Sequence, residues 1–427
     1  MATVNYRQII LEQREELALN NTTDYVQREK KEEISTGTSL AQIITGVRRC
    51  GKSTLARMAL NDLHYGYVNF DDERLSRLEA TALNSLLEAV YSVYGDFSYL
   101  LLDEIQNVEG WHLFVNRLLR NNIKIILTGS NSKLLSSELA SHLTGRYIPV
   151  ELFPFSFTEY LQAQKISVAN PFTAKGRGLA TNYFFSYLYS GGFPEIVYNE
   201  EHKQTYIQNL FDAIVTKDII YRYNIRYIRT FREIALWLTA HFSTEISYNR
   251  IKNIFELGSE NTAKNYLTYL EEAWLFVTLS KFSFKKQESL RNKKIYLVDT
   301  SFAELAGESA TENTGRLLEN TVFLHLIRHR IQGGYEVYYY KKDVEVDFVI
   351  YSKRSVSELV QVSASLSDEK TRAREIRSLV RASEELHPKT ATIITINQKE
   401  DIKTEGIDIS VKPVVEWIFE QQNKAQQ

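Results

Sequence analysis

The chain has 427 residues, of which 44% are hydrophobic and 24% charged, and its formal net charge at pH 7 is -2. A chain of this length exceeds one ordinary hydrophobic core, so we expect two or three domains. The near-neutral charge excludes a global field that recruits nucleic acid, so any basic surface must be local. No stretch has the pattern of a membrane span or signal peptide, and a single cysteine excludes an internal disulfide. We therefore expect a cytoplasmic protein without a membrane partner.

Residues 1 to about 40 have a helical and highly charged pattern, and we interpret the run 28–33 as a solvated face. A short apolar strand follows at residues 43–45, then a loop with the spacing Gly-x-x-x-x-Gly-Lys-Ser, then an amphipathic run at 54–63. Strand, glycine loop and helix in this order form the context of a phosphate-binding loop.

The chemistry expected of this loop follows from its residue types. Gly46 and Gly51 lack a Cβ, so the backbone can turn successive N–H groups toward phosphate oxygens. Lys52 would bring positive charge to the β- and γ-phosphates, and the Ser53 hydroxyl would be a ligand of Mg²⁺. The residues expected to bind the nucleotide are Gly46, Val47, Arg48, Arg49, Cys50, Gly51, Lys52, Ser53 and Thr54.

A second strand at residues 67–70 and a helix at 75–93 lead to the apolar strand 99–102, which ends in Asp103 and Glu104. In open α/β sheets, ligands collect at the carboxyl ends of the strands, where the phosphate-binding loop also lies. We expect Asp103 to hold Mg²⁺, directly or through water, and Glu104 to orient and deprotonate the water that attacks the γ-phosphate. Nucleotide binding without hydrolysis is the alternative, and Glu104 argues against it.

A third strand, residues 123–128, precedes Ser130 and Asn131. Either side chain could reach between the attacking water and the γ-phosphate, or could cap the helix that follows. Arg146 could reach a γ-phosphate bound by a neighbouring subunit, and a surface ion pair is the competing interpretation. The β-α alternation predicts a mostly parallel sheet with helices on both faces, in a domain of residues 1–155.

Aromatic-rich helices in residues 156–225 predict a helical lid whose Tyr and Phe side chains form a core. Residues 226–304 have the pattern of short helices and a hairpin, which predicts a winged helix-turn-helix. Six basic residues accompany one acid in the hairpin, and they are Lys281, Lys285, Lys286, Arg291, Lys293 and Lys294. This basic wing, Lys281–Lys294, would suit a DNA backbone, and a winged helix used only for packing is the alternative.

The last predicted domain is an α/β unit of residues 305–427. Its first helix carries Glu319, and its strands are expected at residues 335–340, 345–351, 358–364 and 391–396. Asp347 lies among the apolar residues of the second strand, where a carboxylate is costly to bury without a partner or a metal.

On these motifs the chain resembles prokaryotic AAA-type ATPases with a C-terminal domain of unknown function, over nearly its whole length. The matching motifs are residues 46–53, 101–106, 127–131, 143–146, 191–195, 294–299 and 318–320. The resemblance implies ATP as the nucleotide, ATP hydrolysis, Ser130 or Asn131 as a sensor, and Arg146 as an arginine finger in a homo-oligomer.

The C-terminal domain of that group is similar to restriction-endonuclease-like folds. Active members of those folds build a Mg²⁺ site from an acid on the first helix, an Asp on a strand and a Glu-x-Lys on the next strand. Glu319 and Asp347 match the first two positions, whereas Gln361 and Ser363 stand at the third. Without the second carboxylate and the lysine, metal binding is weakened and nuclease chemistry loses its usual base. The resemblance therefore implies a degenerate DNA- or protein-binding platform.

These interpretations lead to one preferred function and two alternatives. The preferred function is an ATPase that couples nucleotide turnover to DNA or partner binding through the winged helix and the degenerate nuclease-like domain. The alternatives are a nucleotide-dependent protein-interaction switch without DNA, and an ATP-gated, Mg²⁺-dependent nuclease.

Overall fold

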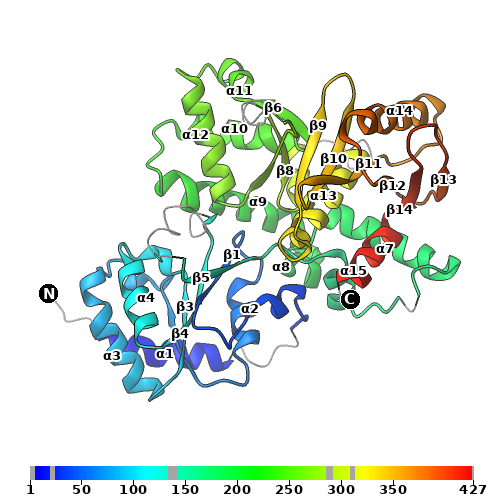
Figure 1. The fold of residues 1–427 in the computed structure, drawn as a ribbon. Helices are drawn as coiled ribbons and strands as arrows, with labels where there is room; N and C mark the ends of the chain where they lie inside the picture. Colours follow the sequence, from blue (N-terminus) through cyan, green and yellow to red (C-terminus); the bar gives the residue numbers. More distant parts are fainter. Residues whose placement is uncertain are drawn as a thin grey trace. The chain divides into compact units, whose positions relative to one another are not determined.

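A computed structural model describes residues 5–19, 25–132, 143, 145–168, 170–284, 292–307 and 313–425 (Figure 1). The chain divides into two compact units. The N-terminal unit consists of Met1–Phe155 with Glu272–Trp274, and the C-terminal unit of Ser156–Glu271 with Leu275–Gln427. The predicted lid and nuclease-like domain fall within the C-terminal unit, and so does the predicted winged helix apart from Glu272–Trp274.

The N-terminal unit is built on a five-stranded sheet in the order β2-β3-β4-β1-β5. Every pairing in it is parallel, which confirms the predicted α/β fold with a parallel sheet. Its strands are β1 (Ala41–Thr45), β2 (Tyr65–Asn69), β3 (Tyr99–Asp103), β4 (Lys124–Gly129) and β5 (Tyr147–Glu151). Its α-helices within the described residues are α1 (Tyr6–Leu19), α2 (Lys52–Ala59), α3 (Leu83–Tyr94) and α4 (Trp111–Arg120).

Strand β3 shows why this sheet is covered on both faces. Successive side chains of a strand point to opposite faces, and Leu100, Leu101 and Leu102 are all buried. One face packs against apolar residues of α1, α3 and α4, which share a single cluster with Leu100 and Leu102. In the strand order, β3, β4 and β1 are neighbours, so their carboxyl ends are adjacent at one edge of the sheet. That edge carries the site.

The charged run expected to be a solvated face is partly buried, which corrects that prediction. Arg28 and Lys30 are both buried, and residues 29–33 form a short 3₁₀ helix, η2 (Glu29–Glu33). The Arg28 guanidinium donates to the carbonyl oxygens of Cys50 (2.8 Å) and Phe153 (2.6 Å) and lies over the Phe155 ring. Its burial is tolerated because these carbonyls satisfy the charged donors.

The C-terminal unit begins with helices. The first is α6 (Phe157–Ala163), which starts at a capping box formed by Ser156 and Glu159. The others are α7 (Ala174–Ser190), α8 (Pro194–Tyr198), α9 (Lys203–Ala213), the π-helix η8 (Ile214–Tyr221) and α10 (Ile228–Ala240). Among the described residues no helix has both the length and the apolar character needed to cross a bilayer.

A three-stranded antiparallel sheet follows, in the order β6-β8-β7. Its strands are β6 (Thr244–Ser247), β7 (Phe276–Ser280) and β8 (Asn292–Leu297), and its helices are α11 (Tyr248–Ile254) and α12 (Glu260–Glu272). Of the predicted basic wing, Lys285, Lys286 and Arg291 lie outside the described residues.

The last part of the chain forms a six-stranded mixed sheet in the order β13-β14-β12-β11-β10-β9. Its strands are β9 (Glu336–Lys341), β10 (Glu345–Ser352), β11 (Ser355–Val362), β12 (Thr390–Thr395), β13 (Glu400–Ile402) and β14 (Ile409–Pro413). The helices are α13 (Thr314–Gly333), α14 (Glu369–Leu386) and α15 (Val414–Ala425). The small sheet joins this part through Phe282, whose N–H donates to the Tyr339 carbonyl at 2.6 Å.

Two of the matching motifs, residues 191–195 and 294–299, contact each other in this unit. The Asp299 carboxylate accepts hydrogen bonds from the Gly192 N–H (2.8 Å) and the Ser301 N–H (3.0 Å). Gly191 has φ +77°, and a Cβ there would lie 1.9 Å from Asp299 Oδ1. A glycine is therefore required at this contact, and both motifs have a structural role.

Candidate functional site

The phosphate-binding loop leaves β1 and enters α2, as its sequence predicts. Gly51, which precedes α2, has φ +98°, a backbone conformation that favours glycine. A Cβ on Gly46 would lie 2.0 Å from the Leu152 carbonyl oxygen. Both glycines are therefore required by the geometry of the loop. Cys50 is buried, and its thiol contacts the same Leu152 carbonyl at 3.4 Å.

Lys52 is the first residue of α2, and its ammonium is turned back over the loop. Its Nζ donates to the carbonyl oxygens of Gly46 and Val47, each at 3.2 Å. The same atom lies 3.7 Å from Glu104 Oε1. The positive charge is thus held at the mouth of the loop, with one carboxylate nearby and 5% of the residue exposed.

The two predicted Mg²⁺ ligands lie next to each other. The Ser53 hydroxyl, at the start of α2, donates to Asp103 Oδ1 at 2.9 Å. Thr128 also donates to Oδ1, and the Tyr67 hydroxyl donates to Oδ2 at 3.3 Å. Burial raises the pKa of Asp103 above its ordinary value. A buried carboxylate beside a hydroxyl is an oxygen donor set that suits Mg²⁺, which commonly takes one or two protein carboxylates together with substrate phosphates.

Glu104 follows Asp103 with φ +56°, an uncommon backbone conformation for a residue with a side chain. Its N–H donates to the Thr128 hydroxyl (3.2 Å), and its Oε2 accepts from the Ser130 N–H (3.2 Å) and from Gln106. Burial alone would raise the pKa of Glu104, but the Lys52 ammonium and these hydrogen bonds lower it overall. The carboxylate is therefore ionised near neutral pH, the state that a general base requires.

Ser130 and Asn131 are both buried beyond the end of β4. The Ser130 N–H contacts the Glu104 carboxylate, whereas its hydroxyl makes no hydrogen bond within the described part of the chain. The structure thus brings the predicted sensor residue to the predicted base. The helix that either residue was expected to cap lies outside the described residues, so the capping alternative stays a prediction.

Arg146 precedes β5 and is exposed. Its backbone carbonyl accepts a hydrogen bond from the N–H of Ala41, the first residue of β1, at 3.0 Å. This bond fixes the backbone of Arg146 beside the sheet. The side chain does not join the cluster around Lys52 and Glu104 in the same unit, and it makes no ion pair with another described residue. Both predicted roles, a finger toward a neighbouring subunit and a surface pair, stay predictions.

Three residues of the site escaped prediction: Arg28, Tyr67 and Thr128. Thr128 links Asp103 to the Glu104 backbone, and Arg28 joins the loop to the segment after β5. The position of Thr128 at the carboxyl end of a strand adjacent to β1 was a usable signal. Arg28 carried no local signal, because its partner Phe153 lies 125 residues away in the sequence.

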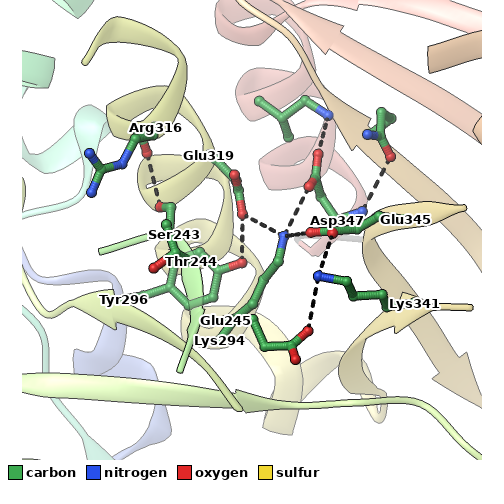
Figure 2. Close-up of polar contacts among 12 residues, drawn as sticks. Ser243, Thr244, Glu245, Lys294, Tyr296, Arg316, Glu319, Lys341, Glu345 and Asp347 are labelled. Atoms are coloured by element: carbon green, nitrogen blue, oxygen red, sulfur yellow. Dashed lines mark hydrogen bonds and ion pairs between the residues drawn. The ribbon is translucent and has the colours of Figure 1, made fainter. Parts of the chain in front are cut away.

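A second cluster of ionisable residues lies in the C-terminal unit, where Figure 2 shows Lys294 pointing toward three carboxylates. Lys294 Nζ lies 3.2 Å from Glu319 Oε1, 2.8 Å from Glu345 Oε1 and 3.2 Å from Asp347 Oδ1. The lysine side chain is 3% exposed. This placement corrects the prediction that Lys294 belongs to a basic wing, because a buried and paired ammonium does not meet a DNA backbone.

Further hydrogen bonds hold the carboxylates of this cluster in place. The Tyr296 hydroxyl donates to Glu319 Oε1 at 2.8 Å, and the Val362 N–H donates to Asp347 Oδ2 at 2.9 Å. Lys341 joins Glu345 to Glu245, at 3.2 Å from each. Burial and the neighbouring Asp347 raise the pKa of Glu319 to about 7. Burial opposes the charge on Lys294, but Tyr296 and the three carboxylates raise the pKa of that lysine above its ordinary value.

Gln361 and Ser363, which stand at the third position of the nuclease pattern, make hydrogen bonds within the protein. Gln361 Oε1 accepts from the Asp347 N–H (3.2 Å), and its Nε2 donates to Glu375 Oε2 on α14 (2.6 Å). The Ser363 hydroxyl donates to the Ser365 carbonyl at 3.0 Å. In the described part of the chain, no set of three or more acidic, His or Cys side chains is arranged to hold a metal ion.

Comparison with known families and proteins agrees with the N-terminal site. Residues 38–161 match a family described as an AAA domain, residues 181–312 match a domain of unknown function (DUF8612), and residues 314–415 match a domain of unknown function (DUF4143). The uncharacterized protein MJ1544 of Methanocaldococcus jannaschii is 33% identical over 356 residues, which cover 81% of this chain and 79% of that protein. An uncharacterized protein of Haemophilus influenzae is 29% identical over 400 residues, which cover 90% of this chain and 95% of that protein.

Among solved structures, a Walker-type ATPase of Pyrococcus abyssi, PABY2304, is 16% identical and covers 67% of this chain and 97% of its own. The TM-score of that match is 0.39.

Proposed function

This chain belongs to the same family as MJ1544 and contains an AAA domain, and from that premise we propose that it binds and hydrolyses ATP. The proposal is supported by Lys52, Ser53, Asp103, Glu104 and Ser130, whose contacts lie at one edge of the sheet of the N-terminal unit. The single observation that carries the proposal is the environment of Glu104, an ionised carboxylate between the Lys52 ammonium (3.7 Å) and the Ser130 N–H (3.2 Å).

The loop residues Gly46 to Thr54 wrap the phosphates, and Lys52 exchanges its contacts with two loop carbonyls for phosphate oxygens. Ser53 and Asp103 would hold Mg²⁺, which neutralises charge on the phosphate oxygens when bound. Glu104 orients the attacking water and accepts its proton. Because Lys52 and Glu104 are neighbours, the γ-phosphate and the water are brought to adjacent positions.

We assign the sensor role to Ser130 or Asn131, which follow β4, and the Ser130 N–H contacts the Glu104 carboxylate. Ser130 has the stronger support. Its N–H donates to the Glu104 carboxylate, and its hydroxyl makes no hydrogen bond within the described part of the chain. Arg146 is proposed as an arginine finger that acts in a homo-oligomer, and its exposure supports that role. The preference for ATP rests on the resemblance to AAA-type ATPases.

The test is steady-state ATP turnover in Mg²⁺ by wild type, Glu104→Gln and the matched control Glu109→Gln. Glu109 is an exposed acid just before α4 in the same unit. We expect Glu104→Gln to lower turnover by about 10²- to 10⁴-fold and to keep nucleotide affinity, because only the base is removed. Equal turnover by Glu104→Gln and wild type contradicts the assignment.

For the rest of the chain we propose a lid of residues 156–225, a winged helix of 226–304 and a nuclease-like domain of 305–427, after the ATPase domain of 1–155. These parts would couple turnover to DNA or to a protein partner. The antiparallel β6-β8-β7 sheet with α11 and α12 supports the winged helix. The contacts of Lys294 favour a degenerate nuclease-like domain over an ATP-gated nuclease, because its ammonium already binds Glu319 and Asp347.

A further inference from the structure

A short segment that runs from the end of η8 into the start of α10 has an unusual composition. Residues 221–229 alternate tyrosine and isoleucine with arginine, and we name them the Tyr/Arg segment. Over the slightly longer stretch 217–232 there are five basic residues against one acid, Asp218. In a chain with a net charge of -2, this is a local concentration of positive charge together with aromatic rings.

The tyrosines at the two ends of the segment are exposed. Tyr221 is 74% and Tyr227 is 72% exposed, although tyrosine usually buries most of its ring. The segment between them is anchored. Ile225 is buried and its N–H donates to the Ile220 carbonyl at 3.1 Å, while the Tyr223 ring stacks on Tyr269 of α12 with centroids 3.9 Å apart. The outer rings are therefore presented from a fixed backbone.

The arginines of the segment keep their charge available. Arg226 is exposed and makes no hydrogen bond or ion pair with another described residue. The Arg229 side chain is 92% exposed, and its contact with Glu233 (3.0 Å) is a surface pair on one helix, which contributes little energy. Arg222 lies 4.0 Å from Asp218, which is a long contact between a guanidinium and a carboxylate.

The neighbouring helix α12 extends this surface. Through the Tyr223–Tyr269 stack, the segment adjoins α12, whose residues Asn261, Lys264 and Asn265 are exposed. They lie on the face of the helix opposite its buried residues Ala263, Tyr266 and Leu267. Amides and a lysine there add polar groups and positive charge beside the aromatic rings.

We propose that the Tyr/Arg segment binds single-stranded nucleic acid. Exposed rings on a fixed backbone stack on bases, and bases offer their faces only where they are unpaired. Arg222 and Arg226 are the sequence neighbours of Tyr221 and Tyr227, so the phosphates of a strand stacked on the rings come within reach of guanidinium groups, which bind phosphate well. An acidic protein surface would satisfy the arginines and leave two tyrosines without a matching group. The inference refines the DNA coupling proposed above and does not depend on ATP hydrolysis.

The test measures binding of the full chain to a fluorescein-labelled 20-nucleotide oligothymidine by anisotropy. We expect Tyr221→Ala with Tyr227→Ala to weaken binding by about ten-fold or more, and Tyr221→Phe with Tyr227→Phe to retain it, since phenylalanine also stacks. The matched control is Tyr198→Ala, an exposed tyrosine of α8 in the same unit. Thermal melting of each variant checks the fold, which these exposed positions should leave unchanged.

Salt dependence separates the arginines from the rings. Arg226→Ala should lower the slope of log affinity against log salt by about 0.7, the value for one phosphate contact on a single strand, whereas the tyrosine variants should leave it unchanged. Arg120→Ala, an exposed arginine at the end of α4, is the control.

Four outcomes overturn the proposal. They are an absence of binding by wild type, equal affinity of the double alanine variant and wild type, an equal loss in Tyr198→Ala, and displacement of the oligonucleotide by duplex DNA or polyglutamate at equal charge concentration. The Lys52→Ala variant should bind the oligonucleotide normally. A failed turnover assay with intact binding therefore refutes only the ATPase assignment, and the reverse result refutes only this surface.

Discussion

The two units each place a buried lysine among carboxylates, but the two lysines differ in what they leave available. In the N-terminal unit, Lys52 contacts two loop carbonyls and lies 3.7 Å from a single carboxylate. In the C-terminal unit, Lys294 lies within 3.2 Å of three carboxylates. Neutral carbonyls are easily exchanged for phosphate oxygens, whereas several buried ion pairs are costly to separate. The first lysine is therefore ready for an anionic ligand, and the second is fully used within the protein.

In this comparison of the two lysines, the largest expected effect is the loss of catalysis on replacing Lys52. Replacement of Lys52 by Ala removes the positive charge from the loop mouth, and we expect ATP turnover to fall by about 10²- to 10³-fold. Steady-state turnover and ATP affinity of the variant measure this loss. Lys124→Ala in β4 is a control, because that lysine contacts the Tyr99 hydroxyl away from the loop. Turnover close to that of wild type would place the catalytic charge elsewhere.

The second effect concerns stability and uses the two adjacent lysines of β8. Lys294→Met leaves Glu319, Glu345 and Asp347 without their shared partner, and we expect a loss of about 3–5 kcal/mol in the free energy of unfolding. Lys293→Met removes only a partly exposed pair with Glu271 at 3.3 Å, and we expect less than about 1 kcal/mol. Urea unfolding of both variants measures the difference. Similar losses in the two variants would mean that Lys294 stabilises the fold no more than the partly exposed Lys293 does.

The third effect is a pH dependence at Glu319. Its pKa is about 7 in the folded protein and near 4.5 in an unfolded chain, so the folded state binds the proton more tightly. Stability should therefore fall as the pH rises from about 4.5 to about 7, by roughly 1–3 kcal/mol from this group. Glu319→Gln should flatten that part of the stability curve. Parallel curves for wild type and variant, from urea unfolding between pH 4.5 and 8, would contradict the assignment.

The last prediction is that the protein has no nuclease activity. Because Lys294 already binds the carboxylates that match a nuclease site, we expect no Mg²⁺-dependent cleavage of DNA or RNA by wild type or by Asp347→Asn. Gel analysis of labelled single and double strands, with and without ATP, measures this. Cleavage by wild type that disappears in Asp347→Asn would restore the ATP-gated nuclease.

Much of the N-terminal site could be predicted because its signals are local. A glycine spacing before a helix and two acids after an apolar strand each lie within a few residues, and a parallel sheet brings strand ends to one edge. The same argument placed Ser130 near Glu104. The resemblance to restriction-endonuclease-like folds, rather than a local signal, named Glu319 and Asp347 together, and both carboxylates contact the Lys294 ammonium.

The errors came from charged residues whose partners are distant in sequence. Arg28 was expected on a solvated face and Lys294 in a basic wing, since charges usually stay exposed. Each is buried instead, with Phe153 lying 125 residues from Arg28 and Asp347 lying 53 residues from Lys294. No local pattern reveals such a partner.

By itself, the amino-acid sequence determined the phosphate-binding loop, the parallel sheet behind it and the acids that face it. These features depend on backbone conformation and on alternating strands and helices, which short stretches of residues encode. Only the tertiary structure decided which charges are available to a ligand. That depends on burial and on partners from other elements, because the energy of a buried charge is set by everything packed around it.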